Sequence, residues 1–379
     1  MRPRIRAARI PRSFPALLAL AACVAAAPLH AQAVRGHVVE AESGAAVPSA
    51  LVSLLDAEGR QRAATVSDPH GGYHLTAPRA GEYRLRIERI GYATTVSQPL
   101  ALEDGATVEH RLHTRTQRVT LPVVTTTGRQ RRCAARPENV LQAARVWEEA
   151  RKALSIHLLT ERDGRYRFTS RVSIRHLSLN ARAEFSREDS TVESVGMPFT
   201  SLSARSLLRG GYVQEQGDTA WFHGVDAAAI LSDEFLDHHC FGLRDGGTER
   251  PGMVGLTFVP LAGRVAPDVQ GVLWLDRATA ELRLVEYGYT GLRYRGKVAR
   301  LGGRLEFHRL PAGEFILRRW WVRAPLLRPD KSPSWSPLSE RARVAGLVQR
   351  GGDVLRVSTV AGAPVPLDPE PPQERGLGR

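Results

Sequence analysis

The chain has 379 residues and a formal net charge of +14, from 53 lysines and arginines against 39 aspartates and glutamates. Its hydrophobic fraction of 42% is normal for a globular protein and argues against disorder of the whole chain. The basic residues are scattered among acids rather than clustered on one helix or arm. This pattern excludes nucleic acid as an expected partner, because nucleic-acid binding needs a concentrated basic face.

Residues 1–33 are predicted to be an export signal. A basic segment without acids precedes an apolar run, and the small residues of Ala31–Ala33 follow it, as in a cleavable signal peptide. We therefore expect a mature protein that starts at Val34 and is located in the periplasm or at the outer membrane. The apolar run is short for a retained membrane span. A second interpretation stays open: Leu20–Cys23 resembles a bacterial lipobox, and acylation of Cys23 would make the protein membrane-associated.

Residues 34–115 have the pattern of seven short strands with turn residues between them. In one strand Tyr83, Leu85 and Ile87 share a face while charged residues occupy the other, as expected for a half-buried strand. Asp68-Pro69 followed by Gly71-Gly72 predicts a tight turn, because glycine adopts dihedrals closed to other residues. Seven strands at this spacing predict a small β-sandwich.

Four motifs in this region carry a family resemblance. They lie at Gly36–Ala50, Thr65–Tyr73, Gly81–Leu85 and Gly91-Tyr92. Together they resemble the carboxypeptidase regulatory-like domain, which is similar to transthyretin-like and carbohydrate-binding-like modules and is also appended to TonB-dependent receptors. The resemblance implies a non-catalytic seven-strand sandwich of exported proteins, and it does not imply peptidase activity.

The rest of the chain is predicted to contain a linker at 116–136, an α+β domain at 137–360 and a disordered Pro-rich tail at 361–379. Too few amphipathic strands remain for the barrel of a receptor. Two or three helices are expected in the second domain, at 137–155, within 225–239 and at 203–211. Consecutive hairpins around them predict an antiparallel sheet or half-barrel, so the fold class is mainly β.

Three hairpins are predicted in the second domain, with turns at Arg277–Thr279, Pro311–Gly313 and Gly351-Gly352. The first of them, "GVLWLDRATAELRLVEY", resembles a hairpin of periplasmic lipoprotein carriers. That resemblance implies a concave apolar surface able to hold an acyl chain or to serve as an interaction surface.

No catalytic or cofactor motif is apparent. The chain lacks a G-x-S-x-G elbow, a phosphate-binding loop and a G-x-G-x-x-G turn, so we predict no catalytic residues, no cofactor and no metal site. The densest group of potential ligands is Asp233–His239, which includes Asp237. It is interpreted as the solvated face of a helix, and the alternative is a periplasmic metal-dependent hydrolase.

Cleavage after residue 33 leaves two cysteines, Cys133 and Cys240. Export places them in an oxidising compartment, where such a pair tends to form a disulfide. We therefore predict a Cys133–Cys240 bridge.

A tryptophan pair beside arginines is the predicted ligand-binding set, consisting of Trp320, Trp321, Arg319 and Arg323. Strand alternation puts the two indoles on opposite faces, so one could stack on a sugar or a lipid headgroup. The predicted function is non-catalytic binding of a lipid or glycan, or of an envelope protein. A third interpretation is an accessory subunit of a TonB-type receptor system.

Overall fold

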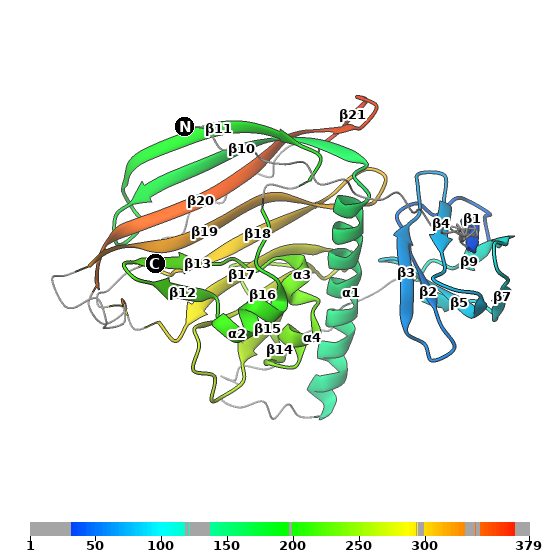
Figure 1. Cartoon of the computed structure of the whole chain (residues 1–379), viewed down its shortest axis with the longest axis horizontal. Helices are drawn as coiled ribbons and strands as arrows, with labels where there is room; N and C mark the ends of the chain where they lie inside the picture. The colour runs from blue at the N-terminus through cyan, green and yellow to red at the C-terminus, as the bar shows by residue number, and fades with distance from the viewer. Residues whose placement is uncertain are drawn as a thin grey trace, which may run out of the picture.

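The computed structural model describes residues 32–117, 121, 137–196, 199–292, 294, 299–329, 338 and 342–367. A small β-sandwich is followed by helix α1 and a large curved antiparallel sheet, with α1 lying between the two (Figure 1). The prediction of a mainly β fold with an N-terminal sandwich and an antiparallel-sheet domain is thus confirmed. The predicted signal, Cys23, Cys133 and most of the predicted linker and tail lie outside the described residues.

The sandwich has nine strands where seven were predicted. The two last predicted strands are each split, near Pro99, which has no amide N–H to donate, and at His110. One sheet has the order β4-β1-β8, with β9 also paired to β1, and the other has the order β3-β2-β5-β6, with β7 paired to β5. The strands are β1 Ala33–Glu40, β2 Leu51–Leu55, β3 Gln61–Val66, β4 Gly72–Thr76, β5 Gly81–Glu88, β6 Thr95–Val96, β7 Leu100–Leu102, β8 Thr107–Glu109 and β9 Leu112–Thr114.

Two details of the family motifs have a direct physical reason. Asp68 accepts backbone N–H bonds from His70 and Gly72, each at 2.8 Å, and Gly71 adopts a φ of 79°, so the predicted turn is formed. Gly36 faces the carbonyl of His110, and a Cβ at Gly36 would lie 1.9 Å from that oxygen. The glycine at position 36 therefore lets His110, between β8 and β9, lie close against β1, with which both strands pair in parallel.

The second domain is built on one sheet of ten strands. Its order is β11-β10-β20-β19-β18-β17-β16-β15-β14, with β21 paired to β20, and a separate hairpin is formed by β12 and β13. The strands are β10 Tyr166–Leu177, β11 Glu184–Ser194, β12 Val213–Gln216, β13 Thr219–Phe222, β14 His239–Asp245, β15 Met253–Pro260, β16 Asp268–Asp276, β17 Leu282–Thr290, β18 Gly302–Arg309, β19 Phe315–Pro329, β20 Ala342–Thr359 and β21 Pro364–Val365.

Two of the predicted hairpins are formed, β16–β17 and β18–β19, but the third is not. The prediction of a turn at Gly351-Gly352 is wrong, because β20 runs straight through both residues. A Cβ at Gly352 would lie 2.7 Å from Nε1 of Trp320, and one at Gly351 would lie 2.7 Å from the Trp320 carbonyl oxygen. The two glycines make room for close packing of the neighbouring strand instead of turning the chain.

The described residues contain four helices: α1 Pro137–Arg162, α2 Ala204–Gly210, α3 Ala227–Ile230 and α4 Asp233–Leu236. Helix α2 begins after the N-cap Ser203 in the region predicted for it. The single helix predicted within 225–239 is broken in two, because Ser232 caps a new helix after the helix capped by Asp226. In the described ranges no helix has both the length and the apolar character needed to cross a membrane.

The apolar stripe that the sequence predicts on helix α1, Val140, Leu141, Ala144, Trp147, Ala150 and Leu154, is confirmed in part. Ala150 and Leu154 are buried, but Leu141 is 70% exposed. Three residues outside the stripe are buried as well: Val146, Ala153 and Ile156. These three belong to the main hydrophobic cluster with residues of the large sheet such as Phe258. The sheet face that packs against α1 and carries Phe168, Leu305 and Trp320 is called the inner face below.

The sandwich is joined to the second domain by apolar and polar contacts. Leu51, Val66 and Ile90 of the sandwich are buried in the same hydrophobic cluster as α1. Glu88, which is 4% exposed at its side chain, forms an ion pair with Arg151 of α1. Three further hydrogen bonds between described residues cross the boundary: Arg165 Nη2 donates to the Val66 carbonyl at 2.7 Å, Arg162 Nη2 to the Ala64 carbonyl at 3.1 Å, and Ser49 Oγ to the Ala312 carbonyl at 2.6 Å. The two domains therefore share part of one core.

Two titratable side chains lie one turn apart near the end of α1. Burial lowers the pKa of His157 to about 4, while its Nδ1 lies 3.2 Å from the Phe315 carbonyl oxygen. Burial, and then the nearby carboxylate of Asp226, raises the pKa of Glu161 to about 7. Their nearest side-chain atoms, His157 Nε2 and Glu161 Oε1, are 3.5 Å apart.

The raised pKa of Glu161 predicts a pH dependence of stability. The folded state keeps the Glu161 proton up to about pH 7, whereas an unfolded glutamate loses it near a pKa of about 4.3. The stability that the Glu161 proton contributes to the folded state is therefore fully present below the pKa of the unfolded state, and it is lost as pH rises towards 7. We expect Glu161→Gln to gain thermal stability relative to the unmodified protein across this window, measured as the difference in Tm at each pH. A difference that stays constant with pH would contradict the assignment.

Candidate functional site

A cavity of about 330 Å³ lies where β16 begins and β17 ends. This volume is within the range of about 300–1,000 Å³ found for small-ligand sites. Its walls combine tyrosine rings, aliphatic side chains, one amide and one guanidinium. The lining residues are Gln270, Gly288, Tyr289, Leu292, Tyr294, Ala299, Arg300, Leu301 and Val344.

The two tyrosines of the cavity are held in place by the β12–β13 hairpin. The Tyr289 hydroxyl donates to the carbonyl oxygen of His223 at 2.9 Å, and the Tyr294 hydroxyl donates to Glu215 Oε1 at 3.0 Å. The Phe222 ring packs against both, with centroid distances of 5.4 Å to Tyr289 and 6.0 Å to Tyr294. Because their hydroxyls are engaged on the hairpin, the rings are available as apolar surfaces of the cavity.

Both phenols are uncharged at neutral pH. Burial raises the pKa of Tyr289 well above its ordinary value, and the neighbouring tyrosines add to the effect. Burial also raises the pKa of Tyr294, together with the nearby Glu215 carboxylate. No phenolate therefore forms in this wall under physiological conditions.

One glycine, Gly288, lines the cavity. It is paired with Gln270 on one side and with Gly302 on the other. A Cβ at Gly288 would lie 3.2 Å from Nε of Arg300, so the guanidinium lies across this glycine. Arg300 is exposed, and in the described part of the chain no carboxylate lies within ion-pair distance of it.

The predicted tryptophan–arginine set is divided between the two faces of the sheet. Trp320 is on the inner face, 8% exposed, with its ring 4.8 Å from that of Phe199. Trp321 and the two arginines occupy the opposite face, where the Arg323 guanidinium lies 4.9 Å from the Trp321 ring centroid. The predicted separation of the two indoles is therefore observed. Whether any of the four contacts a ligand stays a prediction.

Arg319 and Arg323 are engaged by neighbouring strands. Arg319 forms ion pairs with Asp353 of β20 and with Glu306 of β18, the latter at 3.4 Å. Arg323 donates from Nη2 to Gln349 Oε1 at 2.8 Å. Burial, followed by the like charge of Arg175, lowers the pKa of Arg323. Both guanidinium groups therefore cross-link strands, which limits how far they can serve an added ligand.

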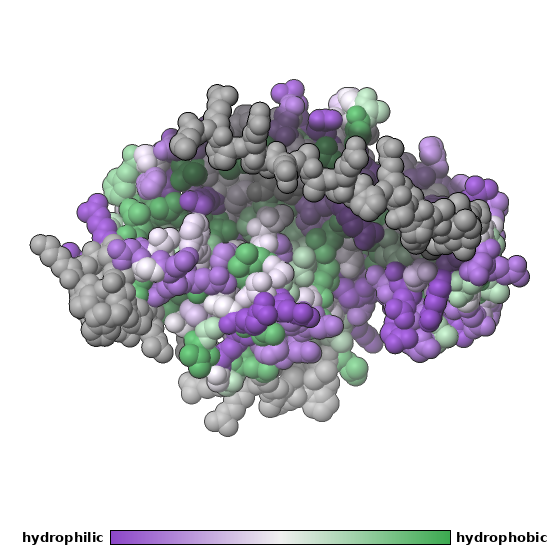
Figure 2. Space-filling model, in the orientation of Figure 1, coloured by the Kyte–Doolittle hydropathy of each residue, from purple (hydrophilic) through white to green (hydrophobic). Residues whose placement is uncertain are grey.

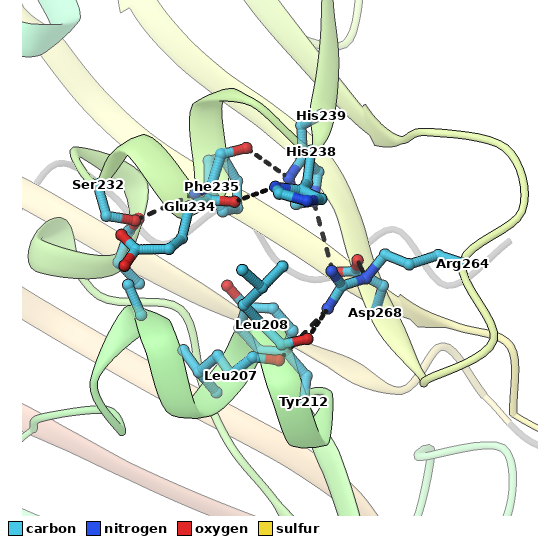
Figure 3. Close-up of a pocket in the computed structure, with 12 residues that line it drawn as sticks. Leu207, Leu208, Tyr212, Ser232, Glu234, Phe235, His238, His239, Arg264 and Asp268 are labelled. Atoms are coloured by element: carbon cyan, nitrogen blue, oxygen red, sulfur yellow. Dashed lines mark hydrogen bonds and ion pairs between the residues drawn. The ribbon is translucent and has the colours of Figure 1, made fainter.

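The side chains around Asp233–His239 are packed closely together, with little free space between them (Figure 3). His239 is buried, stacks on Phe235 with a centroid distance of 3.9 Å, and has Nε2 3.4 Å from Asp268 Oδ1. Arg264 pairs with the same carboxylate and donates to the Leu207 and Leu208 carbonyls at 3.3 and 3.2 Å. The cavity at this place is only about 10 Å³, which has room for about one water molecule.

The carboxylates named with this region do not converge on it. Asp233 and Asp237 are exposed at the two ends of α4, and Asp237 is its C-cap. Among the residues that the structure describes, no three His, Cys, Asp or Glu side chains form a group that could hold a metal ion. The geometry therefore gives no support to a hydrolytic site at 233–239.

Cys240 lies on β14 with a half-buried side chain, and Cys133 lies outside the described residues. The Cys133–Cys240 bridge thus stays a prediction.

Sequence reasoning missed Gln270, Tyr294 and Arg300. A signal for two of them was present, because "GLRYRGKVAR" at 291–300 combines an aromatic with basic residues directly after a strand. The contribution of Gln270 and of the β12–β13 hairpin arises only from tertiary pairing.

Comparison with known families gives a match for the first domain. Residues 33–115 match the family model of the carboxypeptidase regulatory-like domain. The resemblance drawn from the sequence motifs is thereby confirmed, and a domain of this kind fits a non-catalytic binding role. The match covers the sandwich alone. No curated protein matches the chain.

Solved structures give weak matches. GBS52, the minor pilin of Streptococcus agalactiae, is 16% identical with a TM-score of 0.19, and the match covers 26% of this chain and 48% of that one, about half its length. A proposed carbohydrate-binding protein from Bacteroides uniformis is 9% identical, with a TM-score of 0.21 and coverage of 68% and 95%. A DUF3823 family protein from Parabacteroides merdae is 11% identical, with a TM-score of 0.19 and coverage of 71% and 97%. Scores at this level carry no argument about function.

Proposed function

We propose that this chain is an exported, non-catalytic binding protein of the cell envelope, and that its second domain holds a small ligand in the cavity beside Tyr289 and Tyr294. The observation that carries the proposal is the cavity itself, about 330 Å³ in volume and walled by ring faces and polar groups. Aromatic rings beside a few polar groups are typical of sites that bind small ligands. The export signal of residues 1–33 and the Cys133–Cys240 bridge belong to the same proposal.

A second candidate ligand is an acyl chain on the open part of the inner face. Val172, Ile174, Val322 and Val348 lie half-buried on the neighbouring strands β10, β19 and β20. Figure 2 shows hydrophobic residues exposed over these strands, whereas the surface of the sandwich is mostly hydrophilic. This surface is separate from the cavity, so one experiment can distinguish the two ligands.

The test is a binding screen on the mature protein with the variant Gln270→Trp. Gln270 is exposed on the cavity wall, so an indole there is expected to fill the cavity without unfolding the sheet. The probes are an array of oligosaccharides and a fluorescent long-chain fatty acid. We expect oligosaccharide binding that Gln270→Trp weakens at least tenfold, while Gln98→Trp, at an exposed site on the sandwich, leaves it unchanged.

Two outcomes would overturn the cavity as the binding site. Fatty-acid binding that is insensitive to Gln270→Trp would assign the function to the inner face. Oligosaccharide binding equal in both tryptophan variants would place the sugar site elsewhere on the chain.

A further inference from the structure

The cavity wall carries a positive charge that no described carboxylate neutralises. Arg300 is exposed at the cavity, and its guanidinium lies over Gly288, where a Cβ would come within 3.2 Å of Nε. Other arginines of this domain have carboxylate partners: Arg250, Arg304 and Arg319 pair with Glu286, Glu306 and Asp353. An arginine that lies beside a cavity without such a partner is available to a ligand that supplies the negative charge.

The charge of Arg300 attracts anions over a distance of about a Debye length, roughly 8–10 Å at physiological salt. The Tyr289 and Tyr294 rings add no opposing charge, because burial keeps both phenols protonated.

The remaining walls suit a sugar ring rather than a bare anion. The aromatic faces of Tyr289 and Tyr294 offer flat apolar surfaces at one side, with the aliphatic Leu292 and Leu301 beside them. Gln270 is exposed on the wall and provides an amide that donates and accepts hydrogen bonds. A small inorganic anion would use Arg300 and leave these surfaces empty.

We infer that the cavity binds a sugar that carries an anionic group, with the anion on Arg300, the ring against Tyr289 and Tyr294, and hydroxyl groups bonded to Gln270. This inference rests on the proposed function and specifies its ligand. The same chemistry occurs in soluble acidic polysaccharides and in lipids with acidic sugar headgroups, and the experiment separates these sources.

The experiment measures binding of the full mature chain to a uronic-acid oligosaccharide, to a neutral oligosaccharide of equal length, and to vesicles that carry a glucuronic-acid glycolipid. We expect the acidic probes to bind at least tenfold more tightly than the neutral one, and more weakly as salt is raised. Arg300→Gln should lose about 10- to 100-fold in affinity, as expected for a hydrogen bond between charged groups. Arg300→Lys should lose less, since it keeps the charge but not the bidentate geometry.

The matched control is Arg356→Gln, which removes an exposed arginine from the other end of β20 and should leave the affinity unchanged. Binding to the glycolipid vesicles alone supports the inference and identifies a lipid-linked sugar as the ligand. Binding to the soluble uronic-acid oligosaccharide supports the inference and identifies a polysaccharide as the ligand. Equal affinity for neutral and acidic probes, blocked by Gln270→Trp but not by Arg300→Gln, overturns the inference and leaves the proposed function standing. Absence of binding to any sugar or lipid probe overturns both.

Discussion

Replacing Trp320 with alanine is expected to lower the free energy of unfolding by about 3 to 5 kcal/mol, the cost typical of removing a buried aromatic side chain. Trp320 is 8% exposed on the inner face, and its ring packs against that of Phe199 with a centroid distance of 4.8 Å. The residue opposite it on β20 is Gly352, which has no side chain to fill the space left behind. The cost should therefore lie towards the upper end of this range.

The matched control is Trp321→Ala, one residue along the same strand. Trp321 is half-buried on the opposite face and is covered in part by the Arg323 guanidinium at 4.9 Å. We expect a loss of about 1 to 2 kcal/mol, from partial burial and a cation–π contact. Chemical unfolding followed by far-UV circular dichroism measures both variants. If Trp320→Ala changed ligand binding while leaving the unfolding midpoint intact, Trp320 would be a ligand contact rather than part of the core.

A double-mutant cycle sharpens the assignment. Gly352→Ala places a methyl group 2.7 Å from Nε1 of Trp320, and such overpacking typically costs about 1 to 3 kcal/mol. In the Trp320→Ala background the same methyl group enters the space that the indole vacated, so its cost should fall by at least about 0.5 kcal/mol. Additive effects of the two substitutions would show that the glycine and the indole do not pack together.

The same pair of residues shows where sequence reasoning reaches its limit. Gly351-Gly352 was expected to be a hairpin turn, because adjacent glycines between two alternating segments are a common turn signal. The local sequence does not distinguish a glycine that forms a turn from a glycine that makes room for the indole of a neighbouring strand. The deciding residue, Trp320, is on β19 and reaches Gly352 only through strand pairing.

Turns that depend only on nearby residues were predictable. The turn after Asp68 forms because one carboxylate accepts two backbone N–H groups within four residues, and Gly71 supplies the positive φ that closes it. The sandwich was recognised from several such local features, and the family match confirms it. Local chemistry thus accounts for the part of the fold that the sequence predicted best.

The buried face of α1 and the cavity depend on contacts that no local pattern records. The predicted stripe of α1 is buried at Ala150 and Leu154 but not at Leu141. The helix is contacted by the sandwich as well as by the sheet, which adds Val146, Ala153 and Ile156 to its buried residues. Likewise, Tyr294 and Arg300 are close together in the sequence, whereas Gln270 joins them only because β16 pairs with β17. Pairing between distant strands determines which side chains line the cavity.

Contact between the domains leads to the second prediction: Ile90→Ala in the sandwich should destabilise the second domain. Ile90 is 6% exposed and belongs to the hydrophobic cluster that contains α1 and the inner face of the large sheet. Truncation of a buried isoleucine to alanine typically costs about 2 to 4 kcal/mol. The space left by the truncated side chain borders both domains. The loss of stability should therefore appear in the unfolding of each domain.

Tryptophan fluorescence makes this measurable. All six tryptophans lie after residue 136, so their emission reports on the second domain while the substitution is in the first. We expect Ile90→Ala to shift the tryptophan-detected unfolding midpoint to lower denaturant, and Val96→Ala, at a sandwich residue that is 49% exposed, to leave it in place. An unchanged midpoint for Ile90→Ala would mean that the two domains unfold independently. A lowered midpoint would mean that the regulatory-like sandwich supports the fold of its neighbour, since side chains of the first domain complete the core in which α1 is packed.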